Sequence, residues 1–395
     1  MTEVIWAAQA LLPDGWAQNV AVEIDKGVIK RTTRHVSARG RRVGCLLPAP
    51  VNLHSHAFQR GFAGRAERRG PGTDSFWSWR DVMYRFVDLL TPDEMGAIAA
   101  MAYVEMAEAG FAGVCEFHYL HHGPGGVPYD DRGEMANRIL AAAERTGIGM
   151  TLLPVLYQAG GCDGRALEGG QLRFGNDLKG FSDLLGRIER QPADGVLGVA
   201  PHSLRAVTPE GLARAATMIP KGPVHIHVAE QAAEVDEVLA ARGARPVEWL
   251  LANAPVDRRW CLVHATQMTA PETAALARSG AVAGLCPVTE ANLGDGIFDG
   301  AALRAAGGRF GVGTDSNVMI SLADELRLLE YGQRLRDRAR GVMADPGQST
   351  GRALYEAVLA GGAQAAGRKT GAIAAAHWAD LVALDSASIA LEGAE

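Results

Sequence analysis

Several features of secreted and membrane proteins are scarce in this sequence of 395 residues. It contains only five cysteines, which are scattered and form no Cys-x-x-Cys pair, so neither a disulfide framework nor a thiolate zinc site is expected. No apolar run reaches the length of about eighteen residues that a membrane helix needs, and the N-terminus lacks the basic and apolar regions of a signal peptide. These absences predict a cytoplasmic protein, in which any bound metal has nitrogen and oxygen ligands.

Positive charge is also scarce. The chain has 39 lysines and arginines against 45 aspartates and glutamates, which gives a formal net charge of -6. No basic cluster offers a surface for nucleic acid or for lipid headgroups. With 48% hydrophobic and 21% charged residues, the composition is that of an ordinary globular protein. We therefore expect neither nucleic acid nor a membrane as a partner.

What the sequence does contain is a regular alternation of short apolar runs and helical patterns. This alternation is typical of parallel β-α-β units, and eight runs predict a (β/α)8 TIM barrel. Strand-like pieces at both chain ends predict an additional small β-domain. The eight runs are residues 46–53, 111–119, 148–157, 195–201, 223–228, 259–265, 281–287 and 309–314.

The same pattern divides the chain into two domains. Residues 1–47 and 368–395 are expected to form a small β-sandwich-like domain, and residues 48–367 the catalytic barrel. Capping signals mark helix starts inside the barrel, at Thr91 with Glu94 and at Thr208 before a proline. An amphipathic helix over residues 324–340 is expected after the eighth strand.

Two histidines, His54 and His56, end the first apolar segment two residues apart. Residues at this spacing in a β-strand project from the same face, so both imidazoles can bind one cation. A His-x-His pair is weak evidence by itself, because such pairs also occur on protein surfaces. The interpretation as a metal site therefore depends on ligands elsewhere in the chain.

Other polar residues fall at the ends of the predicted strands, where barrel enzymes build their active sites. Three imidazoles, from His54, His56 and His227, with the Asp315 carboxylate predict one Zn²⁺, or alternatively Fe²⁺. His225 is interpreted as a hydrogen-bonded core histidine. A second metal usually needs a bridging lysine or acid, and Lys179 is expected to be solvated in a helix. The strand-end residues are His54, His56, Tyr119, His202, His227, His264 and Asp315.

Four further residues suggest the chemistry and the substrate. Glu230 lies where a carboxylate can move protons for a metal-activated water, although alone it would be interpreted as a solvated loop residue. His264 can polarise the attacked centre instead of binding metal. Arg80 and Arg205, in expected loops after strands one and four, predict an anionic substrate, with surface salt bridges as the alternative.

Two parts of the Arg80 segment are given other roles. Arg85 is a weaker rival to Arg80 as a substrate ligand. Trp77 and Trp79 are interpreted as packing anchors of a loop.

The sequence resembles the amidohydrolase superfamily and, within it, the formimidoylglutamate deiminase family. The resemblance implies a metal-dependent barrel enzyme that converts N-formimino-L-glutamate and water to N-formyl-L-glutamate and ammonia in histidine degradation. It also implies a homodimer. The segments that carry it are Asn52 to Arg60, Phe76 to Arg80 with Met83 to Arg85, Cys115 to Tyr119, His225 to Gln231 and Gly313 to Asn317.

Carried over to these positions, the resemblance implies three sets of residues. The zinc ligands are His54, His56, His227 and Asp315, and the catalytic residues are Glu230, His264 and Asp315. The glutamate portion of the substrate is held by Gln59, Arg80, Tyr119, His202 and Arg205. Members of the family usually continue beyond the 379–385 segment with further strands, so the small domain is expected to be incomplete at its C-terminal end.

Two other functions are weighed against this one. A deaminase of a neutral heterocycle such as guanine shares the metal motifs, whereas the Gln59-Arg60 extension and the Trp77-Ser78-Trp79-Arg80 segment favour the acidic substrate. A non-catalytic barrel retained as a scaffold usually lacks ligands, and none is missing here.

Overall fold

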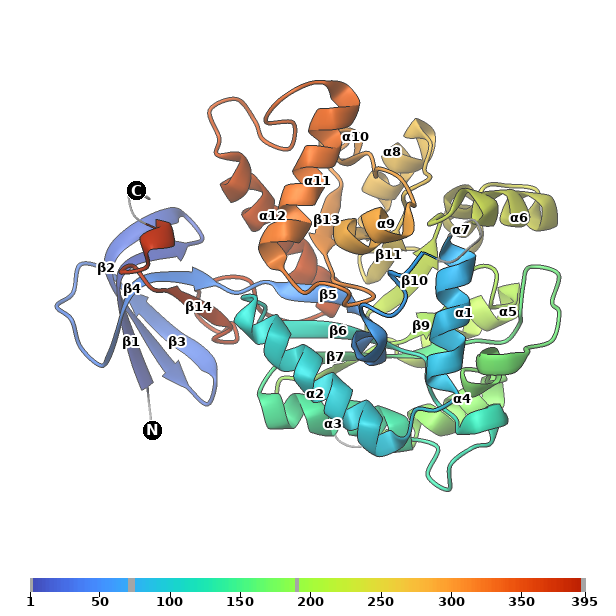
Figure 1. Ribbon diagram of the computed structural model, residues 1–395. Helices are drawn as coiled ribbons and strands as arrows, with labels where there is room; N and C mark the ends of the chain where they lie inside the picture. Colours follow the sequence, from blue (N-terminus) through green and yellow to red (C-terminus); the bar gives the residue numbers. More distant parts are fainter. Residues whose placement is uncertain (1–2, 70–74, 189–191, 392–395) are drawn as a thin grey trace.

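The computed structural model describes residues 3–69, 75–188 and 192–391. Parallel strands form a barrel, with a small separate β-sheet beside it (Figure 1). The barrel strands are β5 (Val51–Ser55), β6 (Gly113–His118), β7 (Gly149–Leu156), the short pair β8 (Val196–Leu197) and β9 (Ala200–Pro201), β10 (Val224–Val228), β11 (Trp260–His264), β12 (Val282–Leu285) and β13 (Arg309–Val312).

The barrel closes by backbone pairing between two parallel sheets. One sheet has the order β5-β6-β7-β8, with β9 paired to β7, and the other has the order β10-β11-β12-β13. Parallel bridges join Val199 to Val224 and Ser203 to His227 at one junction, and Ser55 to Asp315 at the other. The predicted fold class is thereby confirmed. Because the carboxyl ends of all strands meet at one rim, side chains distant in sequence converge there.

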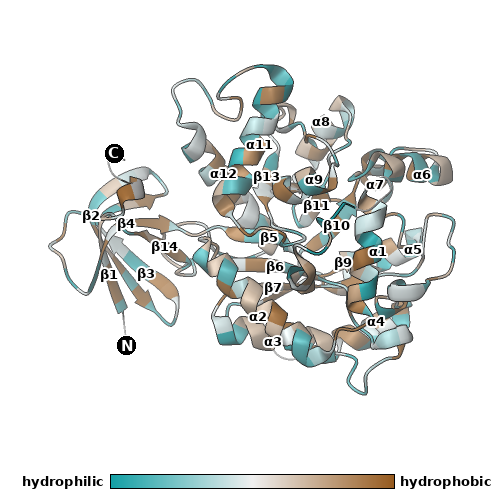
Figure 2. Ribbon diagram, viewed as in Figure 1, coloured by the Kyte–Doolittle hydropathy of each residue, from teal (hydrophilic) through white to brown (hydrophobic). Residues whose placement is uncertain are grey.

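Helices surround these strands, and the ribbons of α2 and α11 carry both hydrophilic and hydrophobic residues (Figure 2). Among the described residues, no helix is both long and apolar enough to cross a membrane. The helices are α1 (Phe76–Val87), α2 (Pro92–Glu108), α3 (Glu134–Thr146), α4 (Leu178–Leu185), α5 (Pro209–Met218), α6 (Ala232–Arg242), α7 (Pro246–Asn253), α8 (Ala270–Ser279), α9 (Pro287–Leu293), α10 (Gly300–Ala305), α11 (Leu322–Asp337) and α12 (Thr350–Ala366), with 3-10 turns η1 (Ala57–Phe62), η2 (Pro124–Gly126), η3 (Gly169–Arg173) and η4 (Ile389–Leu391).

The small sheet draws its strands from both ends of the chain. Its order is β14-β4-β1-β2-β3, with β1 (Glu3–Leu12), β2 (Gly15–Asp25), β3 (Val28–Thr33), β4 (Arg41–Pro48) and β14 (Leu381–Leu384). We propose that the domains divide as expected, into residues 1–47 with 368–395 and residues 48–367. Residues 1, 2 and 392–395 of this division lie outside the described residues.

The expected first barrel strand, residues 46–53, is wrong. The segment belongs to two strands, because β4 ends in the small sheet at Pro48 and β5 begins the barrel at Val51. Pro48 and Pro50 lack an N–H and cannot continue a ladder in the usual way. At the break, the Ala49 N–H donates to the Asp380 carbonyl at 2.8 Å.

Two predicted helix starts are confirmed, and the bounds of a third helix differ from those predicted. Thr91 and Glu94 form the expected capping box before α2, and the Thr208 hydroxyl accepts the Gly211 N–H at the start of α5. The helix expected over 324–340 begins earlier, because the Ser321 side chain caps it, and it ends at Asp337, before Arg338 adopts a left-handed φ of 52°.

The segment around Arg80 is helix α1 and not the expected loop. The Ser75 side chain caps it by accepting the Trp77 N–H, and its buried face includes Met83 and Val87. Trp77 and Trp79 are therefore helix residues, and they differ in their contacts. Trp79 lines a pocket together with Arg80, while Trp77 is 41% exposed and lies against the Arg80 guanidinium.

Candidate metal and active site

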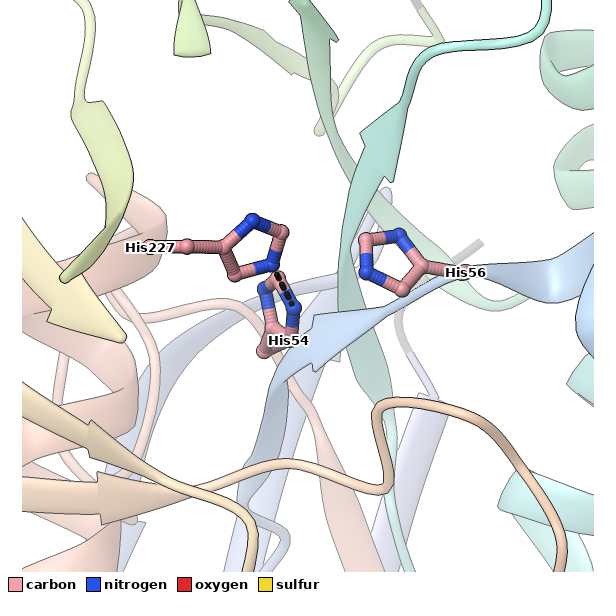
Figure 3. Close-up of side chains that lie close together, drawn as sticks. All are labelled: His54, His56 and His227. Atoms are coloured by element: carbon pink, nitrogen blue, oxygen red, sulfur yellow. Dashed lines mark hydrogen bonds between the residues drawn. The ribbon is translucent and has the colours of Figure 1, made fainter. Parts of the chain in front are cut away.

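Three imidazoles from two strands meet at the carboxyl-end rim of the barrel. His54 is the penultimate residue of β5, His56 precedes the first residue of η1, and His227 comes from β10 in the other sheet (Figure 3). His54 Nε2 lies 3.0 Å from His227 Nε2. His56 Nε2 and His54 Nε2 lie 3.3 Å and 3.5 Å from the same oxygen, Asp315 Oδ1. The four predicted ligands therefore form one cluster.

The donor set fits a metal ion. Ligand atoms of His54, His56 and His227 all lie within 4.8 Å of one another, and so do those of His54, His264 and Asp315. The Phe117 carbonyl, 2.9 Å away, accepts the hydrogen of His56 Nδ1 and leaves the lone pair of Nε2 facing the cluster. Three nitrogens and one carboxylate are ligands suited to zinc or iron.

Burial keeps these imidazoles neutral. It lowers the pKa of His54 to about 3, against an opposing hydrogen bond from Asp315, and it also lowers the pKa of His56 and His227. Burial alone would raise the pKa of Asp315, but its hydrogen bond to His54 and the other imidazoles lower it. Neutral imidazoles beside an ionised carboxylate are the protonation states that metal binding requires.

A buried hydrogen-bond network fixes Asp315. The Asn317 amide donates to Ser55 Oγ and to the carbonyls of His56 and Asp315, each at 3.1 Å. Asp315 and Asn317 both have left-handed backbones, with φ of 45° and 54°. A Cβ on Gly313 would lie 2.6 Å from the backbone of His54, so glycine permits the close approach of β13 to β5. Strained backbone held by such contacts is common at functional sites.

Glu230 and His264 lie next to this cluster. His264 Nε2 is 3.7 Å from Glu230 Oε1 and 3.8 Å from Asp315 Oδ2. Burial raises the pKa of Glu230 to about 7, although His264 opposes the change. Burial acts to lower the pKa of His264, but the Glu230 and Glu290 carboxylates hold it well above its usual value. This pair can accept and donate protons near neutral pH.

A pocket with about 710 Å³ of empty space opens over the cluster. It brings together every predicted substrate and catalytic residue, and among the predicted ligands only His54 lies outside its lining. The predicted residues in the lining are His56, Gln59, Arg80, Tyr119, His202, Arg205, His227, Glu230, His264 and Asp315.

The two pocket arginines form no direct ion pair among the described residues, although, against the effect of burial, the nearby Glu234 and Glu230 carboxylates raise the pKa of Arg205. The Nε atoms of both are buried without a hydrogen bond. Arg80 lies 4.4 Å from the Trp77 ring centroid, which orients its guanidinium. Surface salt bridges, the alternative interpretation, are therefore absent from this part of the chain. Unpaired guanidiniums in a pocket fit an anionic ligand.

Gln59 and Tyr119 are also linked within the pocket. The Gln59 amide donates to the Tyr119 hydroxyl at 2.7 Å, which leaves buried Gln59 Oε1 without a partner among the described residues. His202 Nδ1 lies 3.1 Å from Ser203 Oγ. These polar groups add directional contacts to the charge of the two arginines.

The structure separates the rejected candidates from this site. Arg85 is exposed and donates to the Asp81 carbonyl. Lys179 is solvated, with 84% of its side chain exposed, and pairs with Asp183. His225 is buried, and its Nε2 lies 2.8 Å from the Ala365 carbonyl, as predicted for a core histidine.

Sequence reasoning missed three residues at the site. Tyr157 lines the pocket beside His202, with ring centroids 4.6 Å apart, and its position at the end of the third predicted strand was a usable signal. Glu290 contacts His264 at 3.3 Å, and Asp295 has a carboxylate oxygen within 4.8 Å of the ligand atoms of Glu230 and His264. Glu290 lies in α9 and Asp295 follows it, so no strand-end pattern points to either residue.

Family models cover almost the whole chain. Residues 45–392 match the amidohydrolase family, and residues 2–41 match the N-terminal domain of formimidoylglutamate deiminase HutF. The first match covers the barrel and β14, and the second covers strands β1 to β3 of the small sheet.

Relatives and solved structures agree with these models. The chain is 50% identical over 402 residues to formimidoylglutamate deiminase of Pseudomonas aeruginosa, covering 99% of this chain and 88% of the relative. It is 27% identical to 5-methylthioadenosine/S-adenosylhomocysteine deaminase of Natronomonas pharaonis, over 87% of this chain and 73% of that protein.

A crystal structure of an amidohydrolase from Brucella melitensis superimposes with a TM-score of 0.96 at 52% identity, covering 100% of this chain and 88% of that one. The chain therefore belongs to the amidohydrolase family and, within it, to the formimidoylglutamate deiminases.

Proposed function

We propose that the protein hydrolyses N-formimino-L-glutamate to N-formyl-L-glutamate and ammonia, as a step of histidine degradation. The observation that carries this proposal is the pairing of a metal-type cluster with two unpaired arginines in one pocket. The substrate has an amidine carbon for hydrolysis and two carboxylates for the arginines. The 50% identity to the Pseudomonas aeruginosa enzyme supports the same activity.

The metal ion is proposed to be one Zn²⁺, held by His54, His56, His227 and Asp315. When bound, the ion supplies Lewis-acid activation of the attacking water. The close spacing of the four side chains and the neutral state of the imidazoles support this assignment. Lys179 lies on the surface, and the described residues that line the pocket include no lysine to bridge a second ion.

Glu230 is proposed to move the proton. It accepts one proton from water as the water oxygen bonds to the formimino carbon, and it delivers that proton to the terminal nitrogen. The second water proton, on the hydroxyl of the adduct, is proposed to reach the same nitrogen through Glu230 as the carbon-nitrogen bond breaks, so that NH3 leaves and the formyl C=O forms. A carboxyl with a pKa near neutrality can do both. His264 and Asp315 face the same space, and His264 is proposed to stabilise the negative charge that develops during attack.

The glutamate portion of the substrate is assigned to the polar side chains farther up the pocket. Arg80 and Arg205 are proposed to bind its carboxylates, and Gln59, Tyr119 and His202 to orient it. A neutral heterocycle such as guanine would leave both guanidiniums without an anionic partner, which disfavours the alternative deaminase activity. A cytoplasmic homodimer is proposed from the family alone.

A Glu230→Gln variant tests the proton-transfer role. The amide preserves size but cannot accept a proton from water, so ammonia release from N-formimino-L-glutamate should fall at least about 100-fold. Metal content, measured in the same sample, should stay at the wild-type level. Full activity with bound metal would refute the role of Glu230.

A further inference from the structure

His264 leaves its strand in an uncommon backbone conformation. Its φ is 65° and that of Ala265 is 50°, at the point where β11 ends. Non-glycine residues adopt this left-handed region rarely, and surrounding contacts must hold them there. The residue is 1% exposed, so its ring makes its contacts with protein groups and with the pocket that it lines.

The two ring nitrogens of His264 face different groups. Nε2 points to the site, at 3.7 Å from Glu230 and 3.8 Å from Asp315. Nδ1 points away from it and lies 3.3 Å from Glu290 Oε1. A carboxylate only accepts hydrogen bonds, so the hydrogen between these two atoms belongs to Nδ1.

Glu290 is itself held in place. It is buried in the first turn of α9, and the same Oε1 accepts the Cys286 N–H at 2.8 Å. This bond connects the carboxylate to the backbone that directly follows β12. Glu290 therefore links a rigid strand end to the imidazole ring.

We propose that Glu290 is a positioning residue for the reaction: by accepting the Nδ1 hydrogen of His264, it fixes the ring so that Nε2 faces Glu230 and Asp315. Glu290 does not line the pocket, so it acts through His264 and not on the substrate. The inference rests on the proposed function for the reaction that His264 serves, but the link between the two side chains is independent of it.

Glu325 offers a matched control. It is also fully buried, and its Oε2 accepts the Val288 N–H at 2.9 Å, two residues along from Cys286. Both glutamates thus hold the start of α9, but only Glu290 contacts His264 among the described residues. A structural effect on α9 should appear in both variants, and an effect through His264 in only one.

The activity experiment compares holoenzymes of Glu290→Gln, Glu325→Gln, His264→Asn and the double variant His264→Asn/Glu290→Gln. Loss of a carboxylate that orients a functional imidazole costs about 10- to 100-fold in activity. We expect that loss in kcat for Glu290→Gln, with KM and metal content within about threefold of wild type. Glu325→Gln should keep its kcat, and the double variant should be no worse than His264→Asn.

Nitrogen-15 NMR of histidine-labelled holoenzyme supplies a readout that needs no turnover. The His264 Nδ1–H signal, identified by its loss in His264→Asn, should shift in Glu290→Gln and stay unchanged in Glu325→Gln. An unshifted signal in Glu290→Gln, equal kcat losses in the two glutamate variants, or a further loss in the double variant would overturn the proposal. If the wild type releases no ammonia, the proposed function fails and the NMR comparison alone decides the role of Glu290.

Discussion

His227 Nε2 and His54 Nε2 lie 3.0 Å apart, although the residues are separated by 173 positions in the sequence. Both side chains are buried, and burial lowers the pKa of both. Two neutral imidazole nitrogens at this distance need a shared proton or a cation between them. The pair therefore indicates a site at which metal binding should stabilise the folded chain.

Metal removal should lower stability. A ligand that binds only the folded state, at 100 times its Kd, adds about 2.7 kcal/mol to the free energy of unfolding. We expect the chelated protein to unfold at a lower temperature and to regain the wild-type value with Zn²⁺. His227→Ala should show no zinc-dependent rise, whereas His225→Gln, on the same strand, should retain it. A zinc-dependent rise in His227→Ala would contradict the assigned ligand.

The arginines should control binding of acidic substrates. Arg205→Ala and Arg80→Ala each remove a charged hydrogen-bonding group, worth about 1.5 to 3 kcal/mol and therefore about 10- to 100-fold in kcat/KM. Steady-state ammonia release measures this loss. Arg85→Ala is the control from the same helix, and its exposed side chain should make it equal to wild type. Equal losses for Arg85→Ala and Arg80→Ala would argue against a carboxylate site at Arg80.

Asn317 should matter for stability, because its amide satisfies three buried acceptors around Asp315. Asn317→Ala removes these three hydrogen bonds, although the His56 and Asp315 carbonyls keep the N–H groups of Gln59 and His56 as donors, so we expect a loss of about 1 to 3 kcal/mol in the free energy of unfolding, measured with urea. Asn253→Ala, which removes an exposed amide, should cost less than about 0.5 kcal/mol. A loss below about 1 kcal/mol for Asn317→Ala would show that the network contributes little.

Glu116 should make stability depend on pH. Its carboxyl is fully buried on β6, and burial raises its pKa from 4.5 to about 8. The folded chain keeps this proton while the unfolded chain releases it, so stability is present below pH 4.5 and is lost as pH rises to about 8. Between pH values well below 4.5 and well above 8, the contribution of Glu116 to the free energy of unfolding falls by about 5 kcal/mol.

Urea unfolding at pH 5 and pH 8 measures this effect. The first pH lies about 0.5 above the ordinary pKa of 4.5, and the second equals the raised pKa of about 8. Glu116→Gln cannot ionise but keeps an oxygen for the Ala57 N–H, so its stability should change less between these conditions. Glu210→Gln, which alters an exposed side chain, should behave like wild type. The role of Glu116 is refuted if Glu116→Gln loses as much stability as wild type does.

The sequence predicted those parts of the site that depend on local pattern. His54, His56, His227 and Asp315 follow apolar runs, and parallel strands bring their carboxyl ends to one rim, so their convergence could be inferred without coordinates. The arginines were identified as polar residues in the right segments, although the segment of Arg80 is helix α1.

Contacts between distant segments could not be predicted in this way. Glu290 reaches His264 across 26 positions, from a helix that begins beyond its strand end. The division between β4 and β5 was also missed, because the apolar run crosses two prolines without a change in composition. In both cases tertiary pairing decides the structure, and periodicity carries no information about it.

The most direct test of the account measures metal content and ammonia release on the same preparation, with N-formimino-L-glutamate and with guanine as substrates. We predict a single bound zinc per chain, ammonia from N-formimino-L-glutamate, none from guanine, and loss of activity on chelation. Ammonia from guanine alone, or undiminished activity on N-formimino-L-glutamate after complete metal removal, would contradict the account.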